Sequence, residues 1–212
     1  AGAIAKLMLK ELDITIQSGI SEIDGIKATT YDFSKVSESE IFALDLSVEQ
    51  AQKDAILKAK NSHNSVGGVA LINVKNAPIG LGEPLYFKLD SQIANAMMSI
   101  NAVKAVEIGD GILASRVLGY ENNDQIRKSG FKTNHSGGIL GGISNGDDIN
   151  VKVYFKATPS IFIEQETIDI HNDEVNCQLK GRHDPCVAVR GSVVSESMMA
   201  LVLADMVLLN MS

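Results

Sequence analysis

The sequence predicts one mixed domain of helices and strands, built around a buried helix. Helical and strand patterns follow one another along the chain, and no low-complexity linker divides them. Several expected strands lie close enough in the chain to pair in antiparallel fashion. Residues 195–211 are apolar on nearly every side, which indicates a helix buried between layers.

The first part of the chain predicts two helices and two strands. Apolar residues at helical spacing, from Ile4 to Leu12, predict an opening helix, and alternating apolar residues then predict a strand that ends near Gly19. Residues 47–50 read Ser-Val-Glu-Gln, a capping box that predicts a helix to about residue 60. Residues 66–74 predict a strand whose glycines mark a bulge or a close backbone approach.

The second part predicts a helix at residues 91–100 and a strand at residues 103–108. Residues 109–150 are rich in Gly, Asn, Asp and Ser. This stretch is too polar and too dense in glycine to form core, so a functional or mobile loop is expected. Strands are expected again at residues 151–156 and 160–163, before the apolar final helix.

The composition is that of an ordinary soluble globular protein. Of the 212 residues, 45% are hydrophobic and 21% are charged. The net charge of -7 argues against a nucleic-acid partner, because phosphate contacts need a positive surface. The 2 cysteines are too few for a disulfide framework and the start shows no secretory signal, so a cytoplasmic location is expected.

No membrane span is expected. The longest apolar run, residues 198–211, contains Asp205 and is shorter than the roughly 20 residues that a bilayer requires. The chain enters a helical pattern at Ala1 with no cap before it, so further sequence is expected upstream.

The densest cluster of glycine and polar residues is Asn134 to Gly146, which contains two glycine pairs. Paired glycines let backbone N–H groups approach a ligand, and successive N–H groups can form an anion nest. The cluster matches neither a Walker loop nor a Rossmann fingerprint. A flexible surface loop is an equally good interpretation of the spacing alone.

A lysine and two hydroxyls lie together in Lys156-Ala157-Thr158-Pro159-Ser160, at the end of an expected strand. Such a group at a strand end can hold a phosphate or a ring carbonyl. The spacing alone favours the simpler interpretation, a strand that ends because Pro159 cannot continue the ladder.

The segment from Gly181 to Cys186 carries the sharpest constellation. In an extended segment Arg182 and Asp184 share one face, about 6–7 Å apart, with His183 opposite. A neighbouring arginine keeps a carboxylate ionised and also recognises phosphate or carboxylate by a two-pronged contact. The alternative is a local ion pair that braces a turn before Pro185, and the pattern alone favours it.

Other reactive residue types indicate no further site. Cys186 has no base near it in sequence, so a buried inert thiol is expected. The 4 histidines show no metal-ligand spacing, and no metal is expected. Glu196 is expected to open the last helix, where a carboxylate complements the dipole. For Arg190, an anionic ligand and a surface position are equally good interpretations.

Three segments, taken together, resemble the chorismate synthase family in their residues and in their order along the chain. Shorter matches at residues 80–84, 98–104 and 106–109 extend the resemblance over nearly the whole chain. The Arg-His-Asp-Pro-Cys run is the most specific of them. The three segments are residues 134–146, Lys156-Ala157-Thr158-Pro159-Ser160-Ile161 and Gly181-Arg182-His183-Asp184-Pro185-Cys186-Val187.

The resemblance implies an α+β fold, a sandwich in which long helices lie between two antiparallel sheets, assembled as a homotetramer. Residues 1–212 would form a single domain, the C-terminal portion of such a protein. The implied activity is a lyase that converts 5-enolpyruvylshikimate-3-phosphate to chorismate and phosphate by 1,4-elimination. The implied cofactor is reduced FMN.

The resemblance also assigns roles to residues. Asp184 matches the family's aspartate near flavin N5, which is proposed to help relay a proton. Many relatives read Lys-Pro-Thr where this chain has Lys-Ala-Thr, with its proline moved to position 159. The family's upstream Arg, Ser and Glu motif and two of its histidines have no counterpart here. The implied flavin contacts are Asn101, Ala102, Gly141, Lys156, Ala157, Thr158, Pro159, Ser160 and Arg182.

The sequence is compatible with three functions. The first is the lyase, complete only with an upstream segment. The second is a flavin-binding or assembly module that is inactive without that segment. The third is a nicotinamide-dependent flavin reductase, because some relatives pair reductase and synthase activities.

Overall fold

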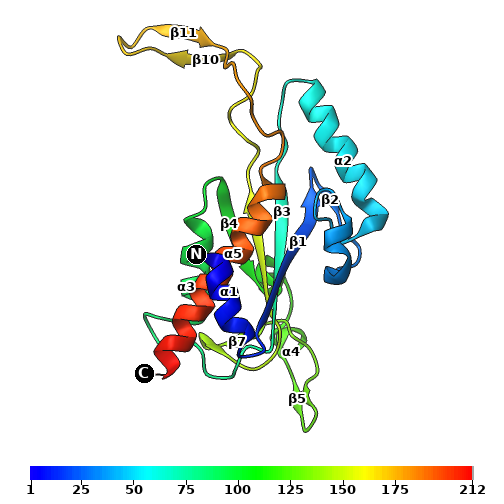
Figure 1. The fold of residues 1–212 in the computed structure, drawn as a ribbon, viewed down its shortest axis with the longest axis vertical. Coiled ribbons are helices and arrows are strands. Elements are labelled where there is room, and N and C mark those ends of the chain that lie inside the picture. The colour runs from blue at the N-terminus through cyan, green and yellow to red at the C-terminus, as the bar shows by residue number, and fades with distance from the viewer. Residues whose placement is uncertain (212) are drawn as a thin grey trace.

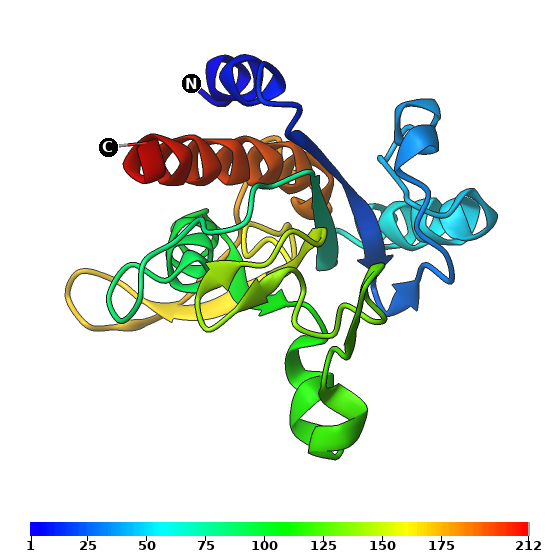
Figure 2. The ribbon, with the colours of Figure 1, turned by 90° about the horizontal axis from the view of Figure 1, so that it is seen from below.

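The computed structural model describes residues 1–211, and it is organised around one antiparallel sheet with helices on one face (Figures 1 and 2). The strand order of this sheet is β2-β1-β3-β9-β4, and every neighbouring pair is antiparallel. Its strands are β1 (Thr15–Ile23), β2 (Ile26–Lys27), β3 (Gly68–Lys75), β4 (Val103–Ile108) and β9 (Ile149–Phe155).

Helices and short 3-10 turns connect the strands. Their bounds are α1 (Gly2–Lys10), η1 (Phe33–Glu38), α2 (Leu46–Asn61), α3 (Leu89–Met98), η2 (Gly111–Arg116), α4 (Gly119–Asn122) and α5 (Ala188–Met211). Three further pairs of short strands form separate hairpins in the described part of the chain. They are β5 (Ile126–Arg127) with β6 (Gly130–Phe131), β7 (Ile139–Leu140) with β8 (Ile143–Ser144), and β10 (Gln165–Ile168) with β11 (Glu174–Cys177).

One layer of helices covers one face of the sheet. Helix α5 packs on β1 and β3, and α1 and α3 flank it, as Figure 2 shows from below. Alternate residues of β9 are buried, and Phe155 at its end packs on α5 at Gly191. A Cβ on Gly191 would lie 2.5 Å from that ring, so only glycine permits this approach. This contact fixes the point where the chain leaves β9.

The outer side of α5 is open in the described chain. Val193, Val194 and Leu208 are about half exposed, with exposed fractions of 49%, 46% and 55%. The expected burial between two layers is therefore present on one side only. By length and composition α5 is the one helix within residues 1–211 that could span a membrane. It is longer than the expected apolar run of residues 198–211, because it begins at Ala188. Its contacts with the sheet, α1 and α3 are those of a core helix.

Two expected helix boundaries were wrong, because tertiary partners set them. Helix α2 is capped by Asp45, whose carboxylate accepts hydrogen bonds from the Ser47 backbone and from Thr29, so the 47–50 pattern does not form the cap. Helix α5 begins at Ala188 instead of residue 195, which places Glu196 inside the helix and not at its start. Glu196 forms an ion pair with Lys6 of α1, so it joins two helices.

Other expected elements differ in detail. The opening helix forms, but Ile4 and Leu7 are exposed, while Gly2, Ala5 and Leu9 face the core. The expected strand at residues 160–163 is absent from its place, and β10 begins later, at Gln165. The polar stretch at residues 109–150 carries η2, α4 and two of the hairpins.

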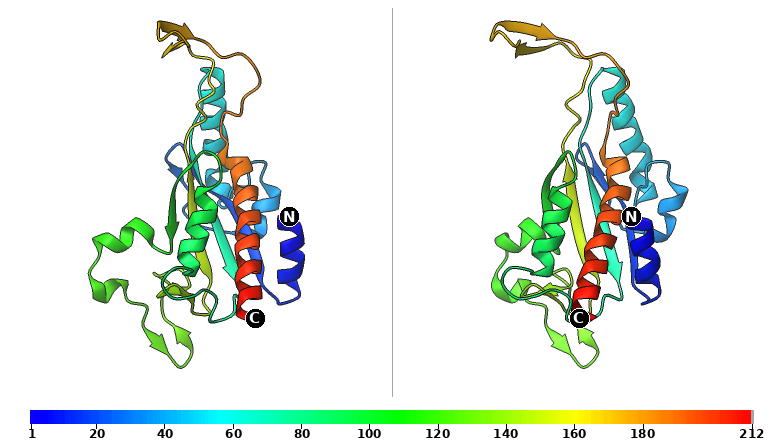
Figure 3. Two further views of the ribbon diagram at one scale, coloured as in Figure 1. Left: turned by 90° about the vertical axis from the view of Figure 1, so that its left-hand side faces the viewer. Right: turned by 60° about the vertical axis from the view of Figure 1, so that its left-hand side comes forward.

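Two of the hairpins project from the body. The β10–β11 hairpin lies at one end of the long axis and the β5–β6 hairpin at the other, which Figures 1 and 3 show from different sides. In the part of the chain that the structure describes, strands β10 and β11 pair only with each other. All residues of both strands are exposed.

Candidate functional site

Two of the predicted site segments meet where β4 begins and β9 ends. The Lys156 backbone N–H donates to the Ala102 carbonyl at 2.9 Å. Ala102 has a φ of 72°, a left-handed conformation that residues other than glycine seldom adopt and that is often kept at functional sites. The predicted contacts Asn101 and Ala102 therefore lie directly beside the 156–160 loop.

A third segment, residues 64–67, ties this loop to the Arg-His-Asp-Pro-Cys run. The Ser65 hydroxyl donates to the Thr158 carbonyl at 2.6 Å, and the Val66 N–H donates to the Pro185 carbonyl at 2.8 Å. A Cβ on Gly67 would lie 2.7 Å from the Phe155 carbonyl oxygen, so the close approach expected of the glycines in this segment is present. We call residues 101–102, 156–160, 64–67 and 182–186 together the loop cluster.

Asp184 is held from helix α5. The Arg190 guanidinium lies 3.1 Å from the Asp184 carboxylate, because α5 begins early enough to place Arg190 in its first turn. The ion pair predicted with Arg182 does not form. Arg182 is exposed, and no ion pair within residues 1–211 includes it. The sequence thus paired Asp184 with the wrong arginine.

Three aromatic rings in edge-on and tilted contact form one wall of the loop cluster. The Phe162 ring lies 6.0 Å from the His63 ring and 5.6 Å from the His183 ring, measured between centroids. The His183 Nε2 and the Thr158 hydroxyl are buried and have no hydrogen-bond partner among residues 1–211. Buried polar atoms without partners are uncommon in folded proteins, and these two can bind a ligand or water. The cluster is therefore incomplete as a hydrogen-bonded unit.

The cavity inside the loop cluster is small. It has a volume of about 30 Å³ and is lined by Ser160, Phe162, His183 and Asp184 among others. Ligand pockets in proteins are typically about 300 Å³ or larger. Asp184 and Ser160 thus share a cavity, but the described chain by itself does not enclose a flavin ring.

Gly141 lies away from the loop cluster. Gly141 and Gly142, with φ values of 62° and 89°, form the two-residue turn of the β7–β8 hairpin, which favours glycine at both positions. The Gly142 carbonyl accepts from the Leu89 N–H at the start of α3, while Ala102 follows the end of α3. The 10 residues of α3 separate the two regions by about 15 Å.

The other glycine pair has a packing role. Gly137 and Gly138 both have positive φ, and a Cβ on Gly137 would lie 2.3 Å from the Gly109 nitrogen. The Asp124 carboxylate accepts from the His135 and Ser136 N–H groups, which holds this segment in place. The pair therefore brings two backbone segments together.

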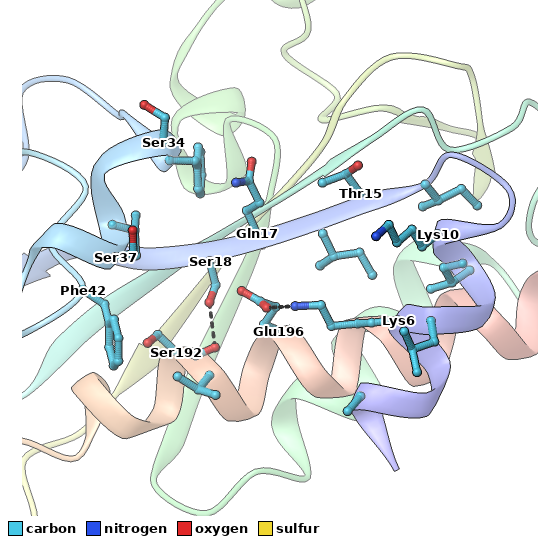
Figure 4. A pocket seen from close by; sticks show the side chains of 18 residues that line it. Lys6, Lys10, Thr15, Gln17, Ser18, Ser34, Ser37, Phe42, Ser192 and Glu196 are labelled. Atoms are coloured by element: carbon cyan, nitrogen blue, oxygen red, sulfur yellow. Dashed lines mark hydrogen bonds and ion pairs between the residues drawn. The ribbon is translucent and has the colours of Figure 1, made fainter.

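A larger cavity, of about 900 Å³, lies elsewhere, between α1, β1, η1 and α5. Figure 4 shows Lys6 and Glu196 paired in its wall, and the Ser18 hydroxyl donating to the Ser192 carbonyl at 3.0 Å. None of the site residues predicted from the sequence lines this cavity.

The structure gives two results on reactive side chains. Cys186 is buried, and burial raises the pKa of its thiol, as expected of an inert cysteine, whereas Cys177 is exposed. Within residues 1–211, no group of three or more His, Cys, Asp or Glu side chains is placed to hold a metal ion.

Sequence reasoning missed Ser65 and did not recognise Arg190 as the partner of Asp184. No local sequence pattern marks Ser65 as a site residue, because its hydrogen bond to Thr158 joins residues that are 93 positions apart in the chain. Arg190 lies six positions after Asp184, and this spacing brings them together only if the helix begins between them.

An antiparallel sheet with one helical layer, and polar loops gathered at one end, defines a domain of the α+β class. Comparison with known proteins identifies the family. Residues 1–208 match the chorismate synthase family model. The chain belongs to the chorismate synthase family.

Individual relatives agree with this assignment. A chorismate synthase of Aliarcobacter butzleri (strain RM4018) is 84% identical over 212 residues, which are 100% of this chain and 59% of that protein. One of Sulfurimonas denitrificans (strain ATCC 33889 / DSM 1251) is 64% identical over 99% of this chain and 59% of that protein. A crystal structure of chorismate synthase superposes with a TM-score of 0.81 at 31% identity, over 99% of this chain and 61% of that one. The chain therefore spans about 59% of the length of these curated relatives.

Proposed function

We propose that the full-length protein containing this chain is an FMN-dependent lyase. It converts 5-enolpyruvylshikimate-3-phosphate to chorismate and phosphate by 1,4-elimination. The observation that carries the proposal is the loop cluster, in which Ala102, Lys156, Ser160 and Asp184 come from distant parts of the chain to one end of the sheet. Membership of the chorismate synthase family supports the same reaction.

The residues of the loop cluster fit the flavin ring and the phosphate of the substrate. Lys156 and Arg182 are exposed cations at its edge, and arginine suits the two-pronged recognition of phosphate. The unpartnered Thr158 hydroxyl and His183 Nε2 supply hydrogen bonds for ring heteroatoms. When bound, reduced FMN supplies electron density as the C–O bond breaks and recovers it afterwards.

Asp184 has the position of a proton-relay group. Its carboxylate is 37% exposed, so it is reachable from the cavity, and Arg190 fixes its orientation. In the reaction Lys156 and Arg182 stabilise the negative charge of the leaving phosphate. The loops around the cavity exclude water from the substrate ring.

The remainder of the protein completes the fold in this proposal. A second antiparallel sheet covers the open side of α5 and α1, where Ile4, Leu7 and Val194 are exposed, and produces the sandwich with helices between sheets. The same segment fills the cavity beside Lys6. Residues 1–212 belong to one domain with it. The assembled enzyme is a cytoplasmic homotetramer.

The proposed flavin contact of Gly141 is supported by a separate observation, the open space beside its turn. A Cβ at Gly141 would meet no atom within 4 Å, so its turn faces open space that a ligand can occupy. Because about 15 Å separates this turn from Ala102, Gly141 does not touch the part of the ligand that Lys156 holds.

Phosphate release separates the proposed function from a binding module. Full-length protein is mixed anaerobically with 5-enolpyruvylshikimate-3-phosphate and reduced FMN, and inorganic phosphate is measured over time. Release by the full-length protein, with none from residues 1–212 alone, is the expected result. FMN binding by the full-length protein without release would favour the module. Nicotinamide oxidation by this chain alone would indicate the flavin reductase.

A further inference from the structure

Two hairpins at opposite ends of the molecule carry opposite charge. Residues 164–180, which include β10 and β11, hold five carboxylates against one lysine, Lys180, and we call this segment the acidic arm. Residues 125–132, which include β5 and β6, hold Arg127, Lys128 and Lys132 with no carboxylate, and we call this segment the basic hairpin. The contrast is notable in a chain whose net charge is -7.

Neither hairpin forms an ion pair with any other described residue. No ion pair in the described structure includes Arg127, Lys128 or Lys132. Apolar side chains on both hairpins face solvent, with exposed fractions of 59% at Ile168 and 62% at Ile126. An isolated two-stranded hairpin is at best marginally stable in water, and its free strand edges can pair with other chains.

The positions of the two hairpins favour a second copy of this protein as the partner. They project at the two ends of the long axis in every lengthwise view (Figures 1 and 3). A two-fold axis perpendicular to that long axis places each acidic arm against the basic hairpin of the other copy. Both contacts then form in one closed dimer, as such symmetry requires.

We infer that the acidic arm of one copy docks on the basic hairpin of a second copy. Ile168 and Ile126 supply the apolar part of this contact, and the surrounding charges fix its orientation. The inference deepens the self-association proposed above and rests on it, but it does not depend on the reaction. It identifies one of the contacts that a homotetramer would use.

Cross-linking tests the contact with the chain's own cysteine. Cys177 lies on the acidic arm and is exposed, while Cys186 is buried. In the full-length protein carrying Lys128→Cys, a short bismaleimide should join Cys177 to position 128 of another copy and give a covalent dimer. The wild type and a Lys27→Cys variant, with its cysteine on β2 away from both hairpins, should stay uncross-linked.

Charge reversal tests the same contact without a reagent. Arg127→Glu combined with Lys128→Glu should raise the dissociation constant of the assembly at least tenfold, measured by analytical ultracentrifugation. Adding Glu166→Lys and Glu174→Lys should restore it, because both partners are then reversed. A control with Lys27→Glu and Lys58→Glu, which reverses two exposed lysines elsewhere, should assemble normally. The wild-type contact should weaken with added salt.

The results separate this inference from the proposed lyase activity. An assembly that is unaffected by the Arg127 and Lys128 reversals, together with no dimer from Lys128→Cys, would overturn the inference even if phosphate release is normal. A protein that is monomeric at all concentrations would overturn it too. A protein that assembles and cross-links as described, but releases no phosphate, would leave the contact supported and the lyase proposal refuted.

Discussion

The Arg190 guanidinium lies 3.1 Å from the Asp184 carboxylate and joins helix α5 to the Arg-His-Asp-Pro-Cys segment. With exposed fractions of 73% and 37%, these side chains form a surface ion pair that adds little stability. Its effect is on geometry. The start of α5 is fixed on the sheet by Gly191 and Phe155, so Arg190 sets the direction of the Asp184 carboxylate.

Asp184→Asn should slow turnover by about 100-fold, the usual size of a general acid or base contribution, while FMN remains bound. The amide keeps the shape of the carboxylate but cannot exchange a proton at neutral pH. The check is kcat beside FMN affinity in the full-length protein. Asp54→Asn, on the exposed face of α2, is the matched control. Unchanged turnover would remove Asp184 from the mechanism.

Arg190→Gln should lower kcat by about tenfold without changing FMN affinity, because a misdirected catalytic group loses rate and not binding. Arg190→Lys keeps the charge near Asp184 and should recover part of the loss. Equal activity of the glutamine variant and the wild type would show that Asp184 needs no orientation from α5.

Substitutions at Gly141 separate a turn role from a flavin role. Gly141→Val should destabilise the hairpin by about 1–2 kcal/mol, because a branched residue is strained at a φ of 62°. Gly141→Asn tolerates that conformation and should fold normally, yet its side chain would occupy the ligand's space and weaken FMN binding by about tenfold. Normal FMN affinity in the asparagine variant would place Gly141 outside the flavin site.

Gly191→Val should cost about 1–3 kcal/mol of folding free energy, because the added carbons meet the Phe155 ring. Since Lys156 follows Phe155 directly, the same variant should weaken FMN binding. Gly119→Ala is the control, because a Cβ there would meet nothing within 4 Å. Urea denaturation of both variants measures the difference. Equal stability would contradict the observed packing of α5 on β9.

The stability of the protein should depend on Asp45 in a defined pH range. Hydrogen bonds from Ser47 and Thr29 hold the pKa of Asp45 well below its ordinary value of 3.8. Its stabilisation is therefore complete above pH 3.8 and declines as the pH falls toward the folded pKa. Asp45→Asn should lower the melting temperature by a few degrees at pH 7. The difference from wild type should narrow below about pH 4, and a constant difference would contradict this account.

Local patterns predicted most of the elements, because apolar periodicity and glycine positions act within short segments. The strands at 66–74 and 103–108 and the helices near 47–60 and 91–100 form close to their expected places. The cap of α2 was missed because the Asp45 carboxylate also accepts a hydrogen bond from the Thr29 hydroxyl, which lies 16 positions earlier in the chain. The start of α5 was missed because small residues such as Ala188 and Gly191 are buried by contacts with the sheet, which no helical pattern shows.

The sequence offered candidate site residues one by one but did not give their arrangement in space. The segments containing Ala102, Lys156 and Asp184 do gather, and the resemblance to a family supplied that grouping. The separation of Gly141 depends on the length of α3, which lies between the two regions. Ser65, which binds the 156–160 loop, carries no local signal at all.

The most direct test is a crystal structure of the full-length protein with bound FMN. The account predicts that the flavin contacts Ala102, Ser160 and Asp184, with Lys156 and Arg182 at its edge. A flavin bound instead in the large cavity beside Lys6 and Glu196, with no contact to these residues, would contradict it.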